Sequence, residues 1–459
     1  MNPEFLRNVW LELTPGRLVA MPVVVGALIA LASAIEFHDA HTQVTWVASI
    51  LFFIFTGLWG TRRAAACVAE EIAQGTWDAQ RMSGLDAWRF AWGKVLGSTI
   101  YTWYGAGFCL IAAAWGMTGQ WSIDSIALIL LTNIAVALTG QLVAFMVSLA
   151  AVRKDRSKKM SRISLGHIIG ISVSIFSSPG ISLADGSAFI GGSTVNWYGE
   201  AYSAHGFHFA SAMVFTGFAF LGAYRAIRSE LQYRNIPWAW TLFTVTIMIY
   251  AGGGAHGLAR NPAMASLAAW VAAFVAGVFL VYIAAFAEDR NIVRYRRIWE
   301  RFKRRAWPEM LIDLPTFKVG FWLLIICGVV VAAKANALPE DVFQVDLRFW
   351  NIEIMPDLWV ISVLLFVARD VFILFALSFY GDGRQKDMAW LMTLIFLYLI
   401  IPALTAVFRF EGVMDWFLPL MEVNKSPNIV VPFIEAAVVG VLVMRKFFST
   451  MPKTTATNT

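Results

Sequence analysis

Long apolar runs alternate with short polar stretches along most of the chain, and the length of the runs predicts membrane-spanning helices. A transmembrane helix needs roughly 20 mostly apolar residues to cross about 30 Å of hydrocarbon. Twelve runs of this kind lie at about 18–37, 44–61, 95–117, 125–151, 163–181, 207–226, 237–258, 263–286, 319–336, 357–380, 388–408 and 428–446. The fifth is rich in Ser and Gly, and the seventh contains three consecutive glycines. We therefore expect an all-α polytopic membrane protein of about twelve transmembrane helices.

The composition excludes several classes of protein. Of 459 residues, 59% are hydrophobic and 14% are charged, whereas soluble domains carry about 25% charged residues. An ordinary soluble globule, a disordered chain and a nucleic-acid-binding protein are therefore excluded. The net charge of +6 fits a membrane surface, because the basic residues lie beside the apolar runs. Three widely spaced cysteines provide neither a disulfide framework nor a cysteine metal motif.

The basic residues predict the orientation of the chain. Of the 36 Lys and Arg residues, 30 lie on the same side of the membrane as the N-terminus, five lie on the other side and one lies within a run. Cytoplasmic loops carry the excess of Lys and Arg in membrane proteins. We expect both termini in the cytoplasm and a multi-pass protein of the inner (cytoplasmic) membrane.

Two long cytoplasmic loops, 62–94 and 287–318, occupy the same place in two successive sets of six runs. Each begins with Ala-Glu and a further acid (Ala69–Glu71 and Ala287–Asp289), and each ends in a lysine, Lys94 or Lys318. Transporters often contain such repeats. The pattern indicates two six-helix modules, 1–235 and 236–459; simple convergence of the two loops is the alternative.

The residues before the first run predict an interfacial helix. Asn2 can cap it, with Pro3 at its first position. Its apolar side chains share one face (Phe5, Leu6, Val9, Trp10 and Leu13), and its polar side chains fall mostly on the other (Glu4, Arg7, Asn8 and Glu12). The break at Thr14-Pro15-Gly16 separates it from the first span. We expect an amphipathic helix that lies in the cytoplasmic interface.

The first long loop contains the most informative motif. It reads Glu71-Ile72-Ala73-Gln74-Gly75-Thr76, then sixteen residues, then Gly93-Lys94. Gly75 is expected to end the helix of the second span, and Thr76 or Ser83 can cap the next helix. The stretch after them mixes apolar side chains with Asp86, Arg89 and Lys94. It predicts a short amphipathic helix over about 78–92, parallel to the membrane, that can transmit a push from a soluble partner.

This loop resembles the permease subunits of type-2 ABC exporters, which carry Glu-x-x-x-Gly-Thr, a sixteen-residue stretch and Gly-Lys. In that family the stretch forms the coupling helix that contacts the nucleotide-binding subunit, and the N-terminal helix resembles the family's elbow helix. Gly84 stands where a proline is frequent, and Gln80-Arg81 replaces an apolar pair. The resemblance covers about residues 2–227. It implies coupling roles for Glu71, Gly75, Thr76, Arg81, Asp86, Trp88, Arg89, Gly93 and Lys94.

The resemblance also implies that ATP is hydrolysed on a separate chain. A phosphate-binding loop needs Gly-x-x-x-x-Gly-Lys-Ser/Thr, and here Val95 follows Gly93-Lys94. We therefore expect a permease without enzyme activity or a cofactor of its own, with ATP-Mg on an ABC ATPase partner. Membrane lipids, a second copy of the chain, or further membrane or periplasmic subunits are the other expected partners, and nucleic acid is not. The basic stretch 294–305 is expected to contact anionic lipid or the ATPase.

Three charged residues lie within the predicted spans: Arg369, Asp370 and Glu435. Intramembrane charges are costly and are candidate functional residues. Neighbours on a helix point about 100° apart, so we expect Arg369 to pair with Glu435 across the bundle and not with Asp370. The pair either fixes helix packing or serves conduction. The same charges, together with His167, would serve an intramembrane enzyme, and they would also suit an ion- or proton-coupled secondary transporter.

Four histidines lie on the outer side, in two His-x-x-His pairs: His38 with His41, and His205 with His208. Their imidazoles can bind Zn²⁺ or Cu²⁺. Solvated loops commonly contain histidine without a metal, and the sequence does not fix the distance between the pairs. No metal is part of the main prediction.

Overall fold

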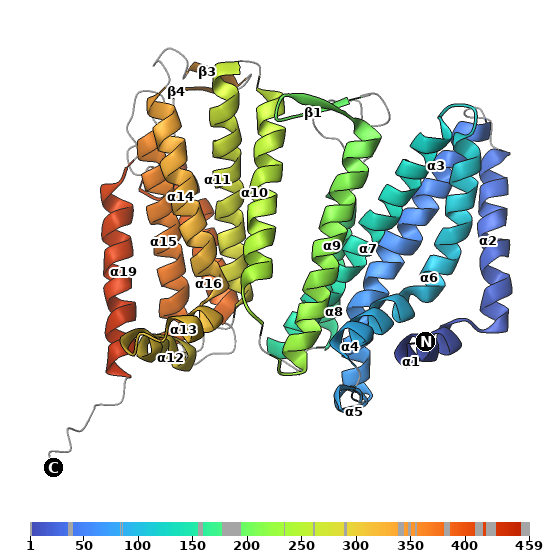
Figure 1. Ribbon diagram of the computed structural model, residues 1–459, viewed down its shortest axis with the longest axis horizontal. Helices are drawn as coiled ribbons and strands as arrows, with labels where there is room; N and C mark the ends of the chain where they lie inside the picture. Colours follow the sequence, from blue (N-terminus) through green and yellow to red (C-terminus); the bar gives the residue numbers. More distant parts are fainter. Residues whose placement is uncertain are drawn as a thin grey trace. The chain divides into compact units, whose positions relative to one another are not determined.

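The computed structural model describes residues 2–34, 40–82, 84, 86–154, 159–176, 194–233, 235–259, 262–288, 292–337, 344–347, 350–353, 356–380, 386–408, 416–418 and 428–450. Within them the protein is all-α, as predicted, apart from two short hairpins (Figure 1). The elements are α1 (Pro3–Glu12), α2 (Pro15–Ser33), α3 (Ala40–Phe53), the π-helix η1 (Ile54–Gly60), α4 (Thr61–Ala73), α5 (Trp77–Arg81), α6 (Ala87–Met117), α7 (Ile123–Lys154), α8 (Lys159–Phe176), β1 (Thr194–Trp197), β2 (Glu200–Ser203), α9 (Ala204–Glu230), α10 (Trp238–Leu258), α11 (Pro262–Ala287), α12 (Ile292–Lys303), α13 (Trp307–Asp313), α14 (Thr316–Asn336), β3 (Gln344–Leu347), β4 (Trp350–Glu353), α15 (Pro356–Tyr380), α16 (Lys386–Ile395), the π-helix η3 (Phe396–Ile400), α17 (Ile401–Val407) and α19 (Val430–Ser449).

The chain forms two compact units. Unit 1 comprises Met1–Val195 and Ala201–Asn235, and unit 2 comprises Asn196–Glu200 and Ile236–Thr459. Each unit has its own buried apolar clusters, so each can be considered as a separately packed body.

Among the described residues, eight helices are long and apolar enough to cross a membrane. They are Ala40–Ala73, Ala87–Met117, Ile123–Ala151, Ala204–Glu230, Met264–Ala287, Thr316–Asn336, Leu358–Tyr380 and Met388–Thr405. A ninth is present if α1 and the start of α2, which meet at 69°, count as one bent span. The fifth, seventh and twelfth predicted spans correspond to α8, α10 and α19, which do not reach this criterion. These helices indicate a multi-pass membrane protein.

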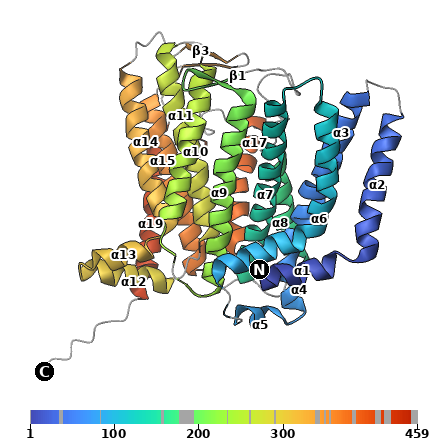
Figure 2. The same ribbon diagram turned by 45° about the vertical axis from the view of Figure 1, so that its right-hand side comes forward.

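Unit 1 is built around α7, which packs against α4, α8 and α9, while α6 packs against α1 and α3. Small residues line the α4 face, and Ala64, Ala65 and Val68 are almost completely buried against Phe145 and Leu149 of α7. Figure 2 shows α1 lying across the end of unit 1 at which α4 and α5 also lie. The predicted break between the interfacial helix and the first span is confirmed, because α1 ends at Glu12 and α2 begins at Pro15.

Unit 2 is built around α11, α14 and α15, with α19 packed along α15 and α10 along α11. Its core is formed by side chains such as Phe274, Val281, Leu324, Val367 and Leu374. Strands β3 and β4 form an antiparallel hairpin in which Gln344 pairs with Glu353 and Leu347 with Trp350. Two short helices, α12 and α13, connect α11 with α14, so the second long loop is helical.

Candidate functional site

The Glu-x-x-x-Gly-Thr motif forms the end of α4 in the way the sequence predicts. Gly75 has a φ of +72°, which is the left-handed conformation typical of the residue after a helix. Its amide donates to the carbonyl of Ile72 over 3.2 Å, and the amide of Thr76 donates to the carbonyl of Glu71 over 3.0 Å. These two bonds are a Schellman motif, and they place Glu71 in the last turn of α4.

The prediction of one amphipathic helix over 78–92 is wrong. The short helix α5 ends at Arg81, Gly84 has a φ of +71°, and α6 begins at Ala87. The carboxylate of Asp86 accepts from the amide of Trp88 over 3.1 Å and caps α6, which satisfies a backbone donor that a continuous helix would have paired internally. Trp88 therefore lies in the first turn of a spanning helix. Ser83, the alternative cap for this helix, and Leu85, an apolar residue within the predicted range, lie outside the described residues.

Lys94 joins the two ends of the motif. Its side chain is 1% exposed, and its ammonium nitrogen forms an ion pair with Glu71 and lies 2.7 Å from Oε1 of Glu4. It also donates to Oε1 of Gln80 over 2.5 Å, and Gln80 donates back to Glu71 over 2.9 Å. The rings of Trp77 and Phe90 lie 5.9 and 5.6 Å from the ammonium group. One lysine thus connects α1, α4, α5 and α6 within an apolar shell.

Helix α1 completes this cluster and carries a second cation. Arg7 donates to Oε1 of Glu71 over 2.5 Å and to Oε1 of Glu4 over 3.0 Å. Asn2 caps α1 as predicted, by accepting from the amide of Glu4, and it also donates to the carbonyl of Arg89 over 2.5 Å. The predicted polar face of α1 therefore packs on the protein, whereas Trp10, on the opposite face, is 81% exposed. We call Glu4, Arg7, Glu71, Gln80 and Lys94 the joint cluster.

Two glycines of α6 make room for α1. A Cβ on Gly93 would lie 2.9 Å from Cβ of Glu4, and a Cβ on Gly97 would lie 2.8 Å from Cβ of Asn8. Side-chain carbons do not normally approach that closely, so α1 can reach the backbone of α6 only where both residues are glycine. The Gly-Lys pair of the motif thus has two uses: the glycine admits α1, and the lysine binds it.

The predicted coupling residues fall into an exposed group and a buried or half-buried group. Gly75, Thr76, Asp86, Trp88 and Arg89 are exposed. Trp88 also packs edge-on against Tyr224 of α9, with ring centroids 5.7 Å apart. Arg81 is half-buried and donates to the carbonyl of Glu230 over 2.6 Å, at the end of α9. Glu71, Gly93 and Lys94 are buried and therefore contribute to the joint cluster and not to an outer surface.

The intramembrane charges form a second cluster, in unit 2. The predicted pair is confirmed: Nη1 of Arg369 lies 2.8 Å from Oε2 of Glu435, across α15 and α19. The prediction that Arg369 does not pair with Asp370 is wrong, because Nε of Arg369 lies 2.9 Å from Oδ1 of Asp370. The long arginine side chain folds back along its own helix, so its guanidinium group reaches both carboxylates despite the angle between neighbouring Cβ atoms.

Aromatic side chains from α15 itself and from other helices surround these charges. Tyr282 of α11 and Tyr398 of η3 each donate a hydroxyl hydrogen bond to Oδ2 of Asp370, over 2.6 and 2.5 Å. The indole of Trp390 donates to the carbonyl of Asp370 over 3.0 Å. The guanidinium carbon of Arg369 lies 4.6 Å from the centre of the Phe366 ring. We call Arg369, Asp370, Glu435, Tyr282 and Tyr398 the midplane cluster.

Sequence reasoning missed the two tyrosines and Trp390. They lie on different helices from Arg369, and an aromatic residue in an apolar run is more often packing than a ligand of a charge. The one available signal was that a Tyr hydroxyl buried in a membrane needs a hydrogen-bond partner.

The histidines do not converge on a metal site in the described part of the chain. His41 stacks on Trp115, with ring centroids 4.6 Å apart, and His205 packs edge-on against Trp121 at 5.2 Å. His208 packs edge-on against Phe207 of the same helix, and His38 lies outside the described residues. No group of three or more His, Cys, Asp or Glu side chains suited to a metal occurs among the residues the structure describes.

His167, the further candidate for intramembrane chemistry, lies in unit 1 and is not part of the midplane cluster. Its Nδ1 lies 3.0 Å from Oγ1 of Thr61.

A search of protein families, of curated proteins and of solved structures found no match to this chain. The function is therefore inferred from the residues of the chain and their geometry.

Proposed function

We propose that the chain is the permease subunit of an ABC exporter, driven by ATP hydrolysis on a separate nucleotide-binding subunit. The observation that supports this most is the ion pair of Glu71 with Lys94. These residues stand at opposite ends of the motif that resembles the family, and their contact gives the spacing of that motif a physical reason.

The joint cluster would act as a lever. Salt bridges bind the end of α4 and the beginning of α6 to α1, and breaking a buried ion pair is costly. A force on the short segment between α5 and α6 would therefore move both spans and α1 together. A loop that is free of its neighbours would absorb the same force by bending.

The exposed part of this segment is the proposed contact for the ATPase. Met82 is 80% exposed, and Asp86 and Arg89 are exposed on the first turn of α6. An exposed apolar side chain beside two opposite charges suits a partner surface that matches it in charge. The buried residues of the joint cluster would then transmit the movement without touching the partner.

Unit 2 contains a related connection, which favours the proposal of two modules. Glu288, at the end of α11, accepts from the amide of Thr316 over 2.9 Å at the start of α14, and Arg294 lies 2.6 Å from its other oxygen. As in unit 1, a glutamate at the end of one span binds the beginning of the next. One chain would then supply both halves of the pathway, in the inner membrane with both termini cytoplasmic.

The test is to purify the tagged chain from its own membranes in mild detergent, identify the co-purifying chains, and measure ATP hydrolysis and transport in liposomes. We expect an ABC ATPase whose activity depends on this chain. The variant Arg89→Glu should lower that activity at least fivefold. The matched variant Lys334→Glu reverses an exposed charge near the C-terminal end of α14 in unit 2 and should leave the ATPase activity unchanged. Nucleotide-independent transport by the chain alone would overturn the proposal.

A secondary transporter is the second candidate, and the midplane cluster favours it. One arginine faces two carboxylates there, so the formal charges do not cancel, and a transported proton or cation would balance them. Transport that follows a proton gradient without ATP would support this candidate against the first.

A further inference from the structure

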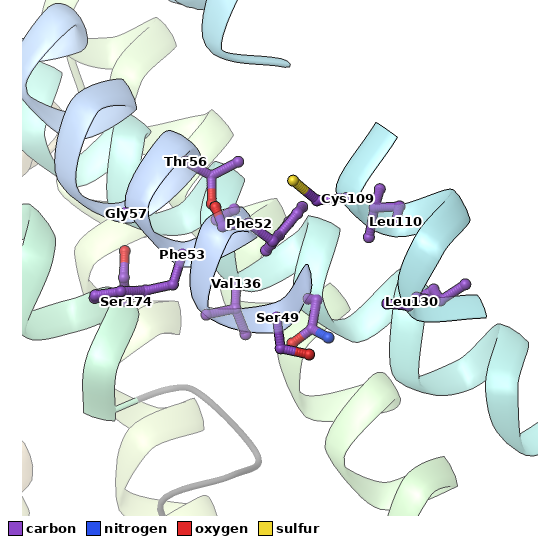
Figure 3. A pocket seen from close by; sticks show the side chains of 13 residues that line it. Ser49, Phe52, Phe53, Thr56, Gly57, Cys109, Leu110, Leu130, Val136 and Ser174 are labelled. Atoms are coloured by element: carbon purple, nitrogen blue, oxygen red, sulfur yellow. The ribbon is translucent and has the colours of Figure 1, made fainter. Parts of the chain in front are cut away.

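Unit 1 contains a cavity of about 100 Å³ between its helices. It is lined by residues of α3, η1, α6, α7 and α8: Ser49, Phe52, Phe53, Thr56, Gly57, Cys109, Leu110, Ala113, Leu130, Asn133, Val136, Ala137 and Ser174. Figure 3 shows these side chains gathered around one space. At 1.5 Å per residue, the lining residues of α6 and α7 lie roughly 5–20 Å from the ends at which these two helices are joined. The cavity therefore lies within the apolar part of the bundle.

None of the described residues that line this cavity carries a charged side chain. Two of its hydroxyl groups are already donors to their own helices: Thr56 donates to the carbonyl of Phe52 over 2.8 Å, and Ser174 donates to the carbonyl of Gly170 over 3.0 Å. Their oxygens remain available as acceptors. The cavity thus has hydrogen-bonding capacity without a group that would attract an ion.

Asn133 is the unusual side chain in the lining. The other hydroxyl and amide side chains from Thr132 to Ser148 on α7 all form hydrogen bonds; Gln141, for example, donates to the carbonyl of Thr56 and accepts from Trp103. In the part of the chain that the structure describes, the amide of Asn133 has none, and neither has the hydroxyl of Ser49. Asn133 is half-buried, and an amide without a partner in an apolar surrounding costs free energy, so this amide is placed to bind something in the cavity. Ser49 is exposed, and its hydroxyl is available to the same ligand.

The backbone beside the cavity is also specialised. Phe53, Thr56 and Gly57 lie at or beside the π-helix η1, and single π-helical turns within α-helices are frequent at functional sites. A Cβ on Gly57 would lie 2.7 Å from the ring of Phe53. Glycine at this position therefore lets Phe53 lie flat against the turn as part of the apolar wall.

We propose that this cavity binds an uncharged ligand in which a hydroxyl, carbonyl or amide group is attached to an apolar chain. Asn133 and Ser49 bind the polar group, and Phe52, Leu110 and Leu130 contact the chain. A water molecule needs about 10–15 Å³ of such space, so the cavity has room for several non-hydrogen atoms. The proposal concerns binding alone and does not depend on an ATPase partner.

The test uses a primary eight-carbon alcohol that carries a photoreactive diazirine. The full-length protein in nanodiscs is illuminated with this probe, and the labelled residues are mapped by mass spectrometry. We expect labels on lining residues of α3, α6 and α7. An excess of unlabelled 1-octanol should remove them. The corresponding eight-carbon carboxylate probe should label these residues at least fivefold less, because the described lining residues include no cation.

Asn133→Leu is the decisive variant. It removes the amide at nearly constant size and should lower the labelling of the cavity about fivefold, since the loss of one hydrogen bond weakens binding by a factor of about 2 to 10. Leu131→Ala, which shortens an exposed side chain two positions away, should not change the labelling. The thermal midpoint of each variant shows whether it is folded. Labels spread evenly over exposed helix faces, or labelling of a folded Asn133→Leu variant at the original level, would overturn the proposal.

Discussion

The two buried ionic clusters differ in how their charges balance. In the joint cluster, Lys94 and Arg7 face Glu4 and Glu71, so two positive charges meet two negative charges. In the midplane cluster, Arg369 is the one cation among the described residues that faces Asp370 and Glu435. Each cluster has one buried atom without a hydrogen-bond partner in the described structure, Oε2 of Glu71 and Nη2 of Arg369, so the clusters differ in charge balance and not in this respect. The side chain of Glu435 is 31% exposed.

This difference separates two uses of buried charge. A balanced cluster at the ends of helices is stable in its paired state, because separating the pairs would leave charges in an apolar shell without partners. An unbalanced cluster within the spans retains capacity for another positive charge. This difference supports the proposal that the joint cluster is a mechanical connection, and we propose the midplane cluster as a place where protonation or a ligand can change the structure.

The largest expected effect is that of Lys94→Met. It leaves Glu4 and Glu71 buried with only Arg7 to balance them, and removal of one partner of a buried ion pair typically costs about 3–5 kcal/mol. We expect a markedly lower midpoint of thermal unfolding in detergent. Size-exclusion chromatography with fluorescence detection, after heating to a series of temperatures, measures this midpoint. The control is Arg89→Met, five residues earlier, whose side chain is exposed. Equal midpoints for the two variants would contradict the connecting role of Lys94.

The second largest effect on stability is expected from a substitution in the midplane cluster. Arg369→Glu leaves three carboxylates without a cation and should lower the thermal midpoint by an amount equivalent to about 3 kcal/mol or more. The double variant Arg369→Glu with Glu435→Arg restores an opposite-charge pair across α15 and α19, so it should recover part of the loss. Recovery is incomplete because Asp370 keeps only its tyrosine partners. If the double variant is no more stable than Arg369→Glu, the cross-helix pair does not stabilise the fold.

The same comparison shows which features the sequence predicts. The all-α fold, the cap of Asn2, the left-handed turn at Gly75 and the pair of Arg369 with Glu435 follow from local rules: helix periodicity, capping preference and the cost of an unpaired charge in lipid. Each of these rules concerns one helix or one costly group, and such signals can be read along a single chain.

The features that the sequence did not reveal depend on other helices. The break before α6 was hidden because Trp88 fits an amphipathic pattern equally well in a loop helix and in the first turn of a span. The hydroxyl groups that bind Asp370 come from Tyr282 and Tyr398, which lie 88 and 28 residues away. Periodicity carries no information on such distant contacts.

A smaller effect is expected from Gly97→Ala. The new methyl group would meet Cβ of Asn8 at 2.8 Å, and relief of such overpacking typically costs about 1–3 kcal/mol. The matched control is Gly107→Ala on the same helix, where the methyl group meets nothing within 4 Å. This control should be neutral or slightly stabilising because alanine favours helix. Thermal midpoints in the same detergent compare the two, and equal values would show that α1 does not need close contact with α6.

The smallest effect is expected from Gly75→Ala, which tests how the joint cluster is positioned. Gly75 has open space around its Cα but a φ of +72°, so the cost comes from backbone conformation alone, about 1 kcal/mol for an L-residue in this region. Gly16→Ala, also in open space but without a positive φ, should cost nothing. Because the turn at Gly75 fixes Glu71 at the end of α4, Gly75→Ala should also make Lys94→Met less costly than it is in the unchanged chain. Strictly additive effects of the two substitutions would show that the turn and the ion pair stabilise the joint cluster independently.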